Sequence, residues 1–347
     1  GAAAQHANPK AQHASPQVAQ RVGAKAPQHV NRKIDRALRQ SLEAGDGTQR
    51  VIISVQPGYL GIVRQALQKH GDLIRREHKG VNAISGVVHS ADVAELAGKP
   101  WIKAVSVDAT VFGGAAGATG GTSAGTASTL RDTLGLPHFS TASTPSGVGV
   151  GVAIIDSGIQ PNADFTGRIT AFYDFTNGGV RTEPYDDYGH GTHVAGLIGA
   201  SGALSNNQFQ GVAPSVKFVV LKVLNKDGQG RTSDVIDAIE FVTANRTALK
   251  VQVINLSLGH PIYAPIADDP LVQAVERASA AGLVVVVSAG NYGVNDGTGL
   301  PGYTGISSPG NSPSSISVGS AIGRNTTTRD DDTVAPYSSR GPSWYDG

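Results

Sequence analysis

The hydrophobic positions of residues 50–112 change period several times within a short stretch. The apolar run Val51–Val55 predicts a buried strand, which Pro57 stops. Apolar residues then recur at helical spacing until Gly71, and two strand-like runs, a short helical pattern and a last apolar run to Val107 follow. This order, β-α-β-β-α-β, predicts a small α+β unit with a ferredoxin-like arrangement.

From Leu130 onward, apolar strand-like runs alternate with helical patterns. Strands are expected at Val148–Ile155, Val216–Val223, Val251–Leu256, Leu283–Ser288 and Ile316–Val318, and helices at Gly191–Ala200, Asp234–Asn245 and Leu271–Ala280. Such alternation is typical of a parallel sheet covered by helices on both faces. We therefore expect a three-layer α/β domain in residues 130–347.

Two segments have almost nothing to bury. Residues 1–28 are rich in Ala, Gln, His and Pro, which predicts a disordered leader. The histidines there and just after it (His6, His13 and His29) could bind a metal ion only weakly. Residues 113–129 are almost entirely Gly, Ala, Ser and Thr, which predicts a flexible linker and an accessible place for proteolytic processing.

The composition narrows the class of protein. Of 347 residues, 39% are hydrophobic and 16% charged, with a net charge of +1, so a globular protein is indicated and a nucleic-acid surface is not. The absence of cysteine excludes disulfides and thiolate metal sites, but it does not exclude secretion. No apolar stretch approaches the length of a membrane span.

Three polar residues stand at or just past the expected strand ends, where parallel sheets gather their functional groups. Asp156 directly follows an apolar strand, so its carboxylate should be partly buried and in need of a partner. His190 lies between glycines in the first turn of a helix, which suits a general base. Asn291 could donate its side-chain amide to a developing oxyanion. Taken singly, the acid could instead cap a turn, and the amide could be a turn residue.

A zinc site is the other chemistry that this region raises. His190 and His193 are three residues apart, but the metalloprotease pattern His-Glu-x-x-His needs a glutamate after the first histidine, and none is present. We therefore expect His193 to be a packed structural residue on the helix.

Together these motifs resemble those of the subtilisin-like serine proteases, the subtilase or peptidase S8 family, whose triad runs in the order Asp, His, Ser. The matching segments are Asp156–Gly158, His190–Gly196, Gly211–Pro214, Val253–Gly259, Ala289–Asn291 and Ser338–Pro342. The resemblance covers residues 148–342. Residues 50–112 resemble the inhibitor propeptide of the family more weakly, through element order and position.

The resemblance implies a secreted endopeptidase made as a zymogen, with polypeptide substrates. Asp156 would orient His190, which would take the proton of a serine hydroxyl and pass it to the leaving amine, and Asn291 would stabilise the oxyanion. The propeptide would act as an intramolecular inhibitor until it is cut off within residues 113–129.

The resemblance also implies substrate-binding residues. The residues that would pair with an extended substrate as an added strand are Gly228, Gln229, Gly230, Ser257, Leu258 and Gly259. Ser288, Ala289 and Gly290 would line a primary specificity pocket able to admit a large apolar side chain, a preference that His260 and Tyr292 could alter.

The serine motif of the family, Gly-Thr-Ser-x-Ala, is expected beyond Gly347, so the chain by itself should lack acyl-transfer activity. A near-match around Ser123 lies in the Gly/Ala/Ser/Thr segment, which offers no rigid mount for a nucleophile. The alternative is a non-catalytic pseudoprotease or binding protein on the same scaffold. A relative that uses glutamate in place of the histidine is disfavoured by His190.

The implied chemistry needs no cofactor, although calcium commonly stabilises the family. Leu204–Gln210 stands where some members have a calcium loop, and it offers Asn206, Asn207 and Gln208 but no carboxylate. Asp330–Asp332 is an acidic cluster that a solvated turn explains more simply. A structural calcium site is therefore possible but unassigned.

Overall fold

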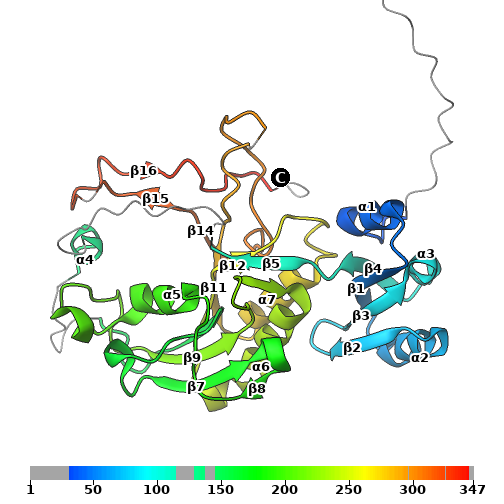
Figure 1. The fold of residues 1–347 in the computed structure, drawn as a ribbon, viewed down its shortest axis with the longest axis horizontal. Helices are drawn as coiled ribbons and strands as arrows, with labels where there is room; N and C mark the ends of the chain where they lie inside the picture. Colours follow the sequence, from blue (N-terminus) through cyan, green and yellow to red (C-terminus); the bar gives the residue numbers. More distant parts are fainter. Residues whose placement is uncertain (1–30, 115–128, 137–144, 296, 325, 344–347) are drawn as a thin grey trace, which may run out of the picture.

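The computed structural model describes residues 31–114, 129–136, 145–295, 297–324 and 326–343 (Figure 1). The predicted leader and most of the predicted linker, including Ser123, lie outside these ranges. A small unit, blue to cyan in Figure 1, stands beside a larger unit that carries the rest of the described chain.

The small unit has the element order that the sequence predicts. Its antiparallel sheet has the strand order β2-β3-β1-β4, with β1 between β3 and β4, as in ferredoxin-like folds. Val51 and Ile53 of β1 are buried in a core that Val63, Leu67 and Val93 of the two helices complete. The elements are β1 (Thr48–Val55), α2 (Leu60–His70), β2 (Leu73–His78), β3 (Ala83–His89), α3 (Ser90–Gly98) and β4 (Ile102–Val107).

A further helix, α1 (Arg36–Ala44), belongs to this unit although the hydrophobic pattern did not predict it. The carboxylate of Asp35 caps it by accepting from the backbone N–H of Leu38 at 2.6 Å, and it also accepts from the N–H of Val107 in β4 at 2.6 Å. The Leu38 side chain is fully buried in the core of the small unit. The unit therefore begins well before residue 50, the boundary that the sequence suggested.

The larger unit is built on a seven-stranded sheet in the order β14-β13-β11-β6-β9-β7-β8. All neighbouring strands pair in parallel except β8, which runs antiparallel to β7 at one edge. The expected strands are present, and β7 and β8 are additional. The strands are β6 (Gly151–Asp156), β7 (Ile169–Asp174), β8 (Val180–Arg181), β9 (Lys217–Lys222), β11 (Val253–Leu256), β13 (Val284–Ser288) and β14 (Ile316–Val318).

Helices cover both faces of this sheet, as its apolar strands require. One face packs against α6 (Thr232–Leu249) and α7 (Pro270–Ala280) in one hydrophobic core, and the other packs against α5 (His190–Gly199) in a second core. The three-layer α/β fold is thus confirmed. The remaining elements are α4 (Leu130–Thr133), the 3-10 turns Ala163–Phe165, Phe175–Asn177 and Ala203–Ser205, and a hairpin of β15 (Ala321–Ile322) and β16 (Thr333–Val334).

One strand links the two units. After β4 the chain leaves the small sheet, and β5 (Thr110–Gly113) lies between β10 (Gln229–Arg231) and β12 (Leu258–Gly259) of the larger unit, antiparallel to both. The predicted boundary at residue 112 therefore falls inside a strand, and Gly113 belongs to that strand rather than to a linker.

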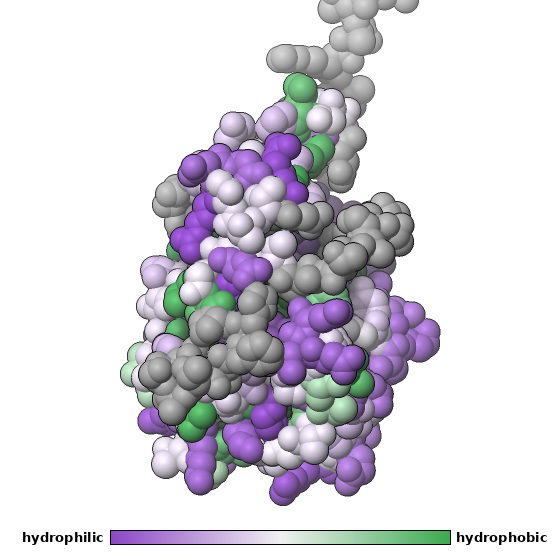
Figure 2. Space-filling model, turned by 90° about the vertical axis from the view of Figure 1, so that its left-hand side faces the viewer, coloured by the Kyte–Doolittle hydropathy of each residue, from purple (hydrophilic) through white to green (hydrophobic). Residues whose placement is uncertain are grey.

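No helix in the described ranges is long and apolar enough to cross a membrane. On the face that Figure 2 shows, hydrophobic residues are scattered among hydrophilic ones.

We expect the Leu38→Ala variant to lower the free energy of unfolding of the small unit by about 2–5 kcal/mol, because it leaves a cavity in a closed core. The exposed Glu43→Ala in the same helix should change it by less than about 0.5 kcal/mol. Urea unfolding followed by circular dichroism measures both. Equal effects of the two substitutions would contradict the packing of α1 described above.

Candidate active site

The side chains of Asp156 and His190 contact each other at the carboxyl end of the central strand β6. The ring nitrogen Nδ1 of His190 lies 2.7 and 2.9 Å from the two carboxylate oxygens of Asp156. Asp156 is completely buried and also accepts from the backbone N–H of Ser157 at 2.7 Å, whereas the imidazole is 21% exposed. An ionised carboxylate only accepts hydrogen bonds, so Nδ1 carries the proton and Nε2 is left free to act as a base.

Two glycines allow this close approach. A Cβ atom on Gly191, in the first turn of α5, would lie 2.2 Å from the backbone oxygen of Gly158, which follows Asp156 and Ser157. Gly158 itself has φ +125° and packs against the backbone oxygen of Tyr185. A side chain at Gly191 would push the helix away from the strand end, and with it the histidine from the aspartate, whereas one at Gly158 would displace the backbone of Tyr185.

Asp186 holds the start of α5 in place, and sequence reasoning missed it. Its carboxylate accepts from the backbone N–H groups of Gly189 at 2.8 Å and Thr192 at 2.9 Å, and from the hydroxyls of Ser157 at 2.9 Å and Thr192 at 2.6 Å. Burial would raise the pKa of Asp186, but these hydrogen bonds outweigh burial and lower it. An acidic residue four positions before a helical histidine was the available signal.

Lys222 is the second missed residue. It pairs with Asp156 across strands β9 and β6, and its buried ammonium donates to the backbone oxygens of Ser157 and Leu224, each at 2.7 Å. It also forms an ion pair with Asp187 at 2.6 Å. Lys222 therefore fixes the backbone on both sides of the aspartate, without contacting the imidazole.

Protonation of His190 is favoured by its partners. Burial of the ring lowers its pKa, but the hydrogen bond and charge of Asp156, together with the charge of Asp186, outweigh burial and raise the pKa above its usual value of 6.5. The ion pair therefore stabilises the fold fully below pH 6.5, and this contribution is lost as the pH rises through the raised pKa.

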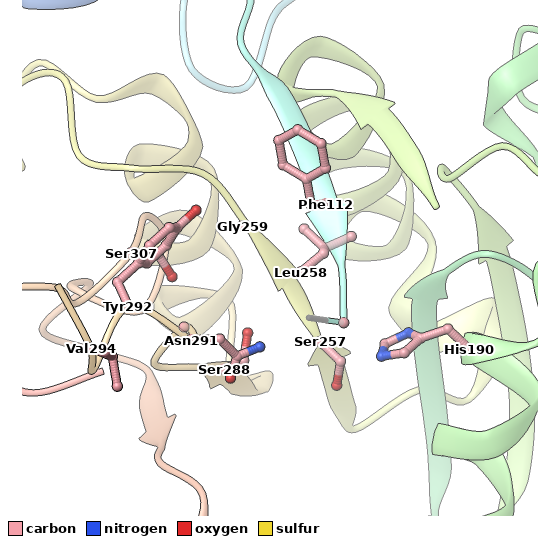
Figure 3. Close-up of a pocket in the computed structure, with 12 residues that line it drawn as sticks. Phe112, His190, Ser257, Leu258, Gly259, Ser288, Asn291, Tyr292, Val294 and Ser307 are labelled. Carbon is pink, nitrogen blue, oxygen red and sulfur yellow. The ribbon is translucent and has the colours of Figure 1, made fainter. Parts of the chain in front are cut away.

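A pocket of about 460 Å³ opens beside this pair (Figure 3). His190 enters from one side and Asn291 from the other, with Ser257 between them. Asn291 follows β13, after Gly290 at φ +102°, and both line the pocket. The pocket is lined by Phe112, Gly114, His190, Ser257, Leu258, Gly259, Ser288, Gly290, Asn291, Tyr292, Val294 and Ser307.

The predicted substrate-binding segments stand on either side of β5. Gln229 and Gly230 are paired with Phe112 and Val111, and the backbone N–H of Gly113 donates to the oxygen of Gly228 at 3.1 Å. On the other side, Leu258 pairs with Gly113 and Gly259 with Phe112. The end of β5 reaches the histidine, since a Cβ atom on Gly114 would lie 3.4 Å from Nε2 of His190.

Some of the candidate residues lie elsewhere. Ala289 is buried behind the pocket, where its oxygen accepts from the hydroxyl of Ser307 at 3.2 Å. His260 is buried and stacked on Tyr263, outside the pocket lining. The prediction that His193 is packed was wrong. It is exposed on α5, because it shares a helix face with the exposed Leu197, which points away from the sheet.

The loop at Leu204–Gln210 brings no carboxylate that could hold calcium. Close to this loop, the buried guanidinium of Arg168 donates to the backbone oxygens of Asp164, Gly199 (2.6 Å) and Val216 (3.4 Å). Among Asp330–Asp332, the Asp331 carboxylate accepts from the hydroxyl of Thr326 at 2.9 Å, as in a hydrogen-bonded turn.

We expect Asp156→Asn to lower the pKa of His190, because burial then acts on the ring without the opposing hydrogen bond and charge of Asp156, and only the charge of Asp186 remains to raise it. NMR titration of the His190 ring proton measures the pKa, and Asp227→Asn, at an ion pair with Lys226 on the surface, serves as control. An unchanged titration in Asp156→Asn would show that the aspartate does not control the imidazole.

The chain is similar to several known proteins. The family model described as Subtilase family (Peptidase_S8) matches residues 147–347. The chain is 44% identical over 207 residues to serine protease AprX of Bacillus subtilis (strain 168), which is 58% of this chain and 45% of that protein. It is 32% identical over 267 residues to subtilisin E of the same organism, which is 76% of this chain and 62% of that protein.

The chain thus spans less than two thirds of the length of either relative. Among solved structures, fervidolysin from Fervidobacterium pennivorans, a keratinolytic enzyme related to subtilisin, has the same fold with a TM-score of 0.61 at 21% identity, over 84% of this chain and 45% of that one. The match of the family model to more than half of the sequence shows that this chain belongs to the subtilase family of serine peptidases.

Proposed function

We propose that this chain is the precursor portion of a secreted serine endopeptidase in which Asp156 and His190 are two members of an Asp-His-Ser triad. The observation that carries the proposal is the contact of Nδ1 of His190 with Asp156 at the edge of a cleft that Asn291 faces from the other side. The serine would come from the part of the family's domain that follows the matched segment.

The geometry supports a division of labour. His190 would accept the serine proton at Nε2 and later deliver it to the leaving amine. Asp156 would hold the ring in the required tautomer and stabilise the imidazolium. Asn291 would donate its side-chain amide to the oxyanion, a contribution of about 10²–10³-fold in rate where a single such donor has been removed from related sites. None of these steps needs a cofactor.

The position of β5 supports the proposal that residues 31–114 act as an intramolecular inhibitor. An extended substrate would add a strand between β10 and β12, and β5 occupies that place with its end at His190. We infer that the chain is cut at or just after Gly114. Cleavage there would leave the small unit bound through its own carboxyl end.

Charged contacts support a stable docking of the small unit on α6. Asp237 of α6 lies 2.7 Å from both Arg76 and the buried His78 of β2, and Glu240 accepts from the backbone N–H of Val81 at 2.9 Å. These partners come from β2 and the turn that follows it, and beside them Ile52 and Ala83 of the small unit are buried in the hydrophobic core that α6 and α7 form.

Asp108, between β4 and β5, provides the other end of this docking surface. Its carboxylate accepts from the backbone N–H and the hydroxyl of Ser233, both at 2.9 Å, and so caps α6 from the other unit. Burial and the charge of Asp108 raise the pKa of Asp234 to about 6, because two acidic side chains lie close together at this contact between the units.

A structural calcium ion is not required at Leu204–Gln210 in this proposal. The loop carries no carboxylate of its own, and the nearby backbone oxygens of Gly199 and Val216, outside the loop, already accept from Arg168.

The alternative is a pseudoprotease on the same scaffold. The complete Asp156–His190 contact, with supporting bonds from Asp186 and Lys222, favours the enzyme, because a scaffold without chemistry does not need an oriented imidazole.

The enzyme proposal is tested with the chain extended through the serine-bearing segment. We expect His190→Ala to reduce kcat/KM for a peptide substrate by roughly 10⁴-fold or more. His193→Ala, an exposed histidine on the same helix, should leave it unchanged. Full activity in His190→Ala, or complete absence of activity in the parent protein after removal of the small unit, would sink the proposal.

The docking of β5 between β10 and β12, on which inhibition by the small unit depends, is tested with Gly113→Val in the present chain. The added Cβ would lie 2.3 Å from the buried Leu224 side chain, so β5 should leave its place between the two strands. We expect the amides of Val111 and Gly113 to exchange with solvent at least about tenfold faster. Gly61→Val, where no atom lies within 4 Å, is the control. Equal exchange in both variants would contradict the docking model.

A further inference from the structure

Four side chains that could bind a metal ion gather at one end of the small unit, far from His190 in sequence. They follow two short patterns, His70-x-Asp72 and His89-x-x-Asp92. His70 ends α2, Asp72 precedes β2, His89 ends β3 and Asp92 lies in the first turn of α3. The cluster therefore joins the ends of four elements that are separated along the chain.

The donor atoms are close together. One ligand atom from each of Asp72, His89 and Asp92 lies within 4.8 Å of the others. Nδ1 of His89 is 2.8 Å from an oxygen of Asp72 and 3.8 Å from an oxygen of Asp92. His70 extends the group, with its Nδ1 3.3 Å from the other oxygen of Asp92.

A buried, unsatisfied atom points independently to a missing ligand. The Asp72 side chain is 1% exposed, and its Oδ1 accepts from both the ring and the backbone N–H of His89. Its Oδ2 is buried and has no hydrogen-bond partner among the described residues. Leaving a buried carboxylate oxygen unpaired costs free energy, and a cation at this point would remove that cost.

We propose that Asp72, His89 and Asp92 bind a divalent transition-metal ion of the zinc class, with His70 beside Asp92 at the edge of the site. Imidazole nitrogen and carboxylate oxygen are the donors that zinc accepts at about 2.0–2.2 Å in tetrahedral sites. Calcium and magnesium prefer six or more oxygen ligands, which two carboxylates do not supply. On binding, the metal ion would take the place of the proton at Nδ1 of His89; that proton passes to solvent and Nε2 takes one up from solvent, so that the ring stays neutral.

A bound metal ion at this site would link elements of the small unit that are far apart in sequence. The ion would tie α2 and β2 to the junction of β3 and α3, and it would bind the folded unit in preference to the unfolded chain. Binding of this kind stabilises the folded state in proportion to the logarithm of the free ion concentration. Small units with limited hydrophobic cores gain the most stability from such a metal link. The proposal does not rest on the protease function.

The experiment uses the whole chain with His6, His13 and His29 replaced by alanine, so that leader histidines do not contribute. Calorimetric titration with zinc chloride should show one ion bound per chain, and cobalt should give the visible spectrum of a tetrahedral complex. His89→Ala should weaken zinc binding by about tenfold or more, and Asp92→Asn should also weaken it. Zinc should raise the melting temperature of the parent chain and not that of His89→Ala.

His193→Ala, an exposed histidine on α5, is the matched control and should bind zinc as tightly as the parent. His89 is half-exposed, so its removal leaves the fold intact, which circular dichroism checks. Absence of stoichiometric zinc binding, or equal binding by the parent and His89→Ala, would overturn the proposal. Tighter binding of calcium than of zinc would overturn the assigned metal class.

Discussion

The buried carboxylate of Asp156 is the constraint on which the rest of the structure depends. It ends the central strand of the sheet with no exposure to solvent, so every charge-stabilising contact must come from the protein. The imidazole of His190 supplies the principal one, and this requires a helix to begin within contact of the strand end. The glycine at Gly191 permits that approach and the carboxylate of Asp186 holds it. Because the Asp156 carboxylate needs a hydrogen-bond donor, Nδ1 of His190 faces it, and Nε2 of the same ring is left at the edge of the pocket.

Polar groups also find their partners across the contact between the small and the larger unit. Asp108 of the small unit satisfies the first turn of α6, which no side chain of its own caps, and the carboxylate of Asp237 of α6 lies 2.7 Å from both Arg76 and His78 of the small unit. Each unit therefore completes polar groups that the other would leave exposed. Apolar packing joins the units as well, because Ile52 and Ala83 of the small unit are buried in the same hydrophobic core as α6 and α7.

Sequence reasoning recovered what depends on local pattern. The strand before Asp156 and the helix after Gly189 follow from an uninterrupted apolar run and from flanking glycines, and the small unit follows from its changes of period. It missed α1, where only Leu38 is fully buried, and it could not see that β5 joins another sheet, because pairing partners more than a hundred residues away leave no local trace. It expected His193 to be a packed structural residue once a zinc site was set aside, although the helix turns this side chain outward.

The register of β5 shows how these contacts act together. Asp108 fixes the beginning of β5 through its hydrogen bonds to Ser233 of α6. The backbone of β5 then pairs with Gly230 on one side and Leu258 on the other, and this register brings Gly113 beside Leu224 and His190. A shift by one residue would put Phe112 at a position where even an added Cβ atom would lie 2.3 Å from the Leu224 side chain. A side chain there would have to displace Leu224, and the glycines at positions 113 and 114 let the backbone pass close beside the imidazole of His190.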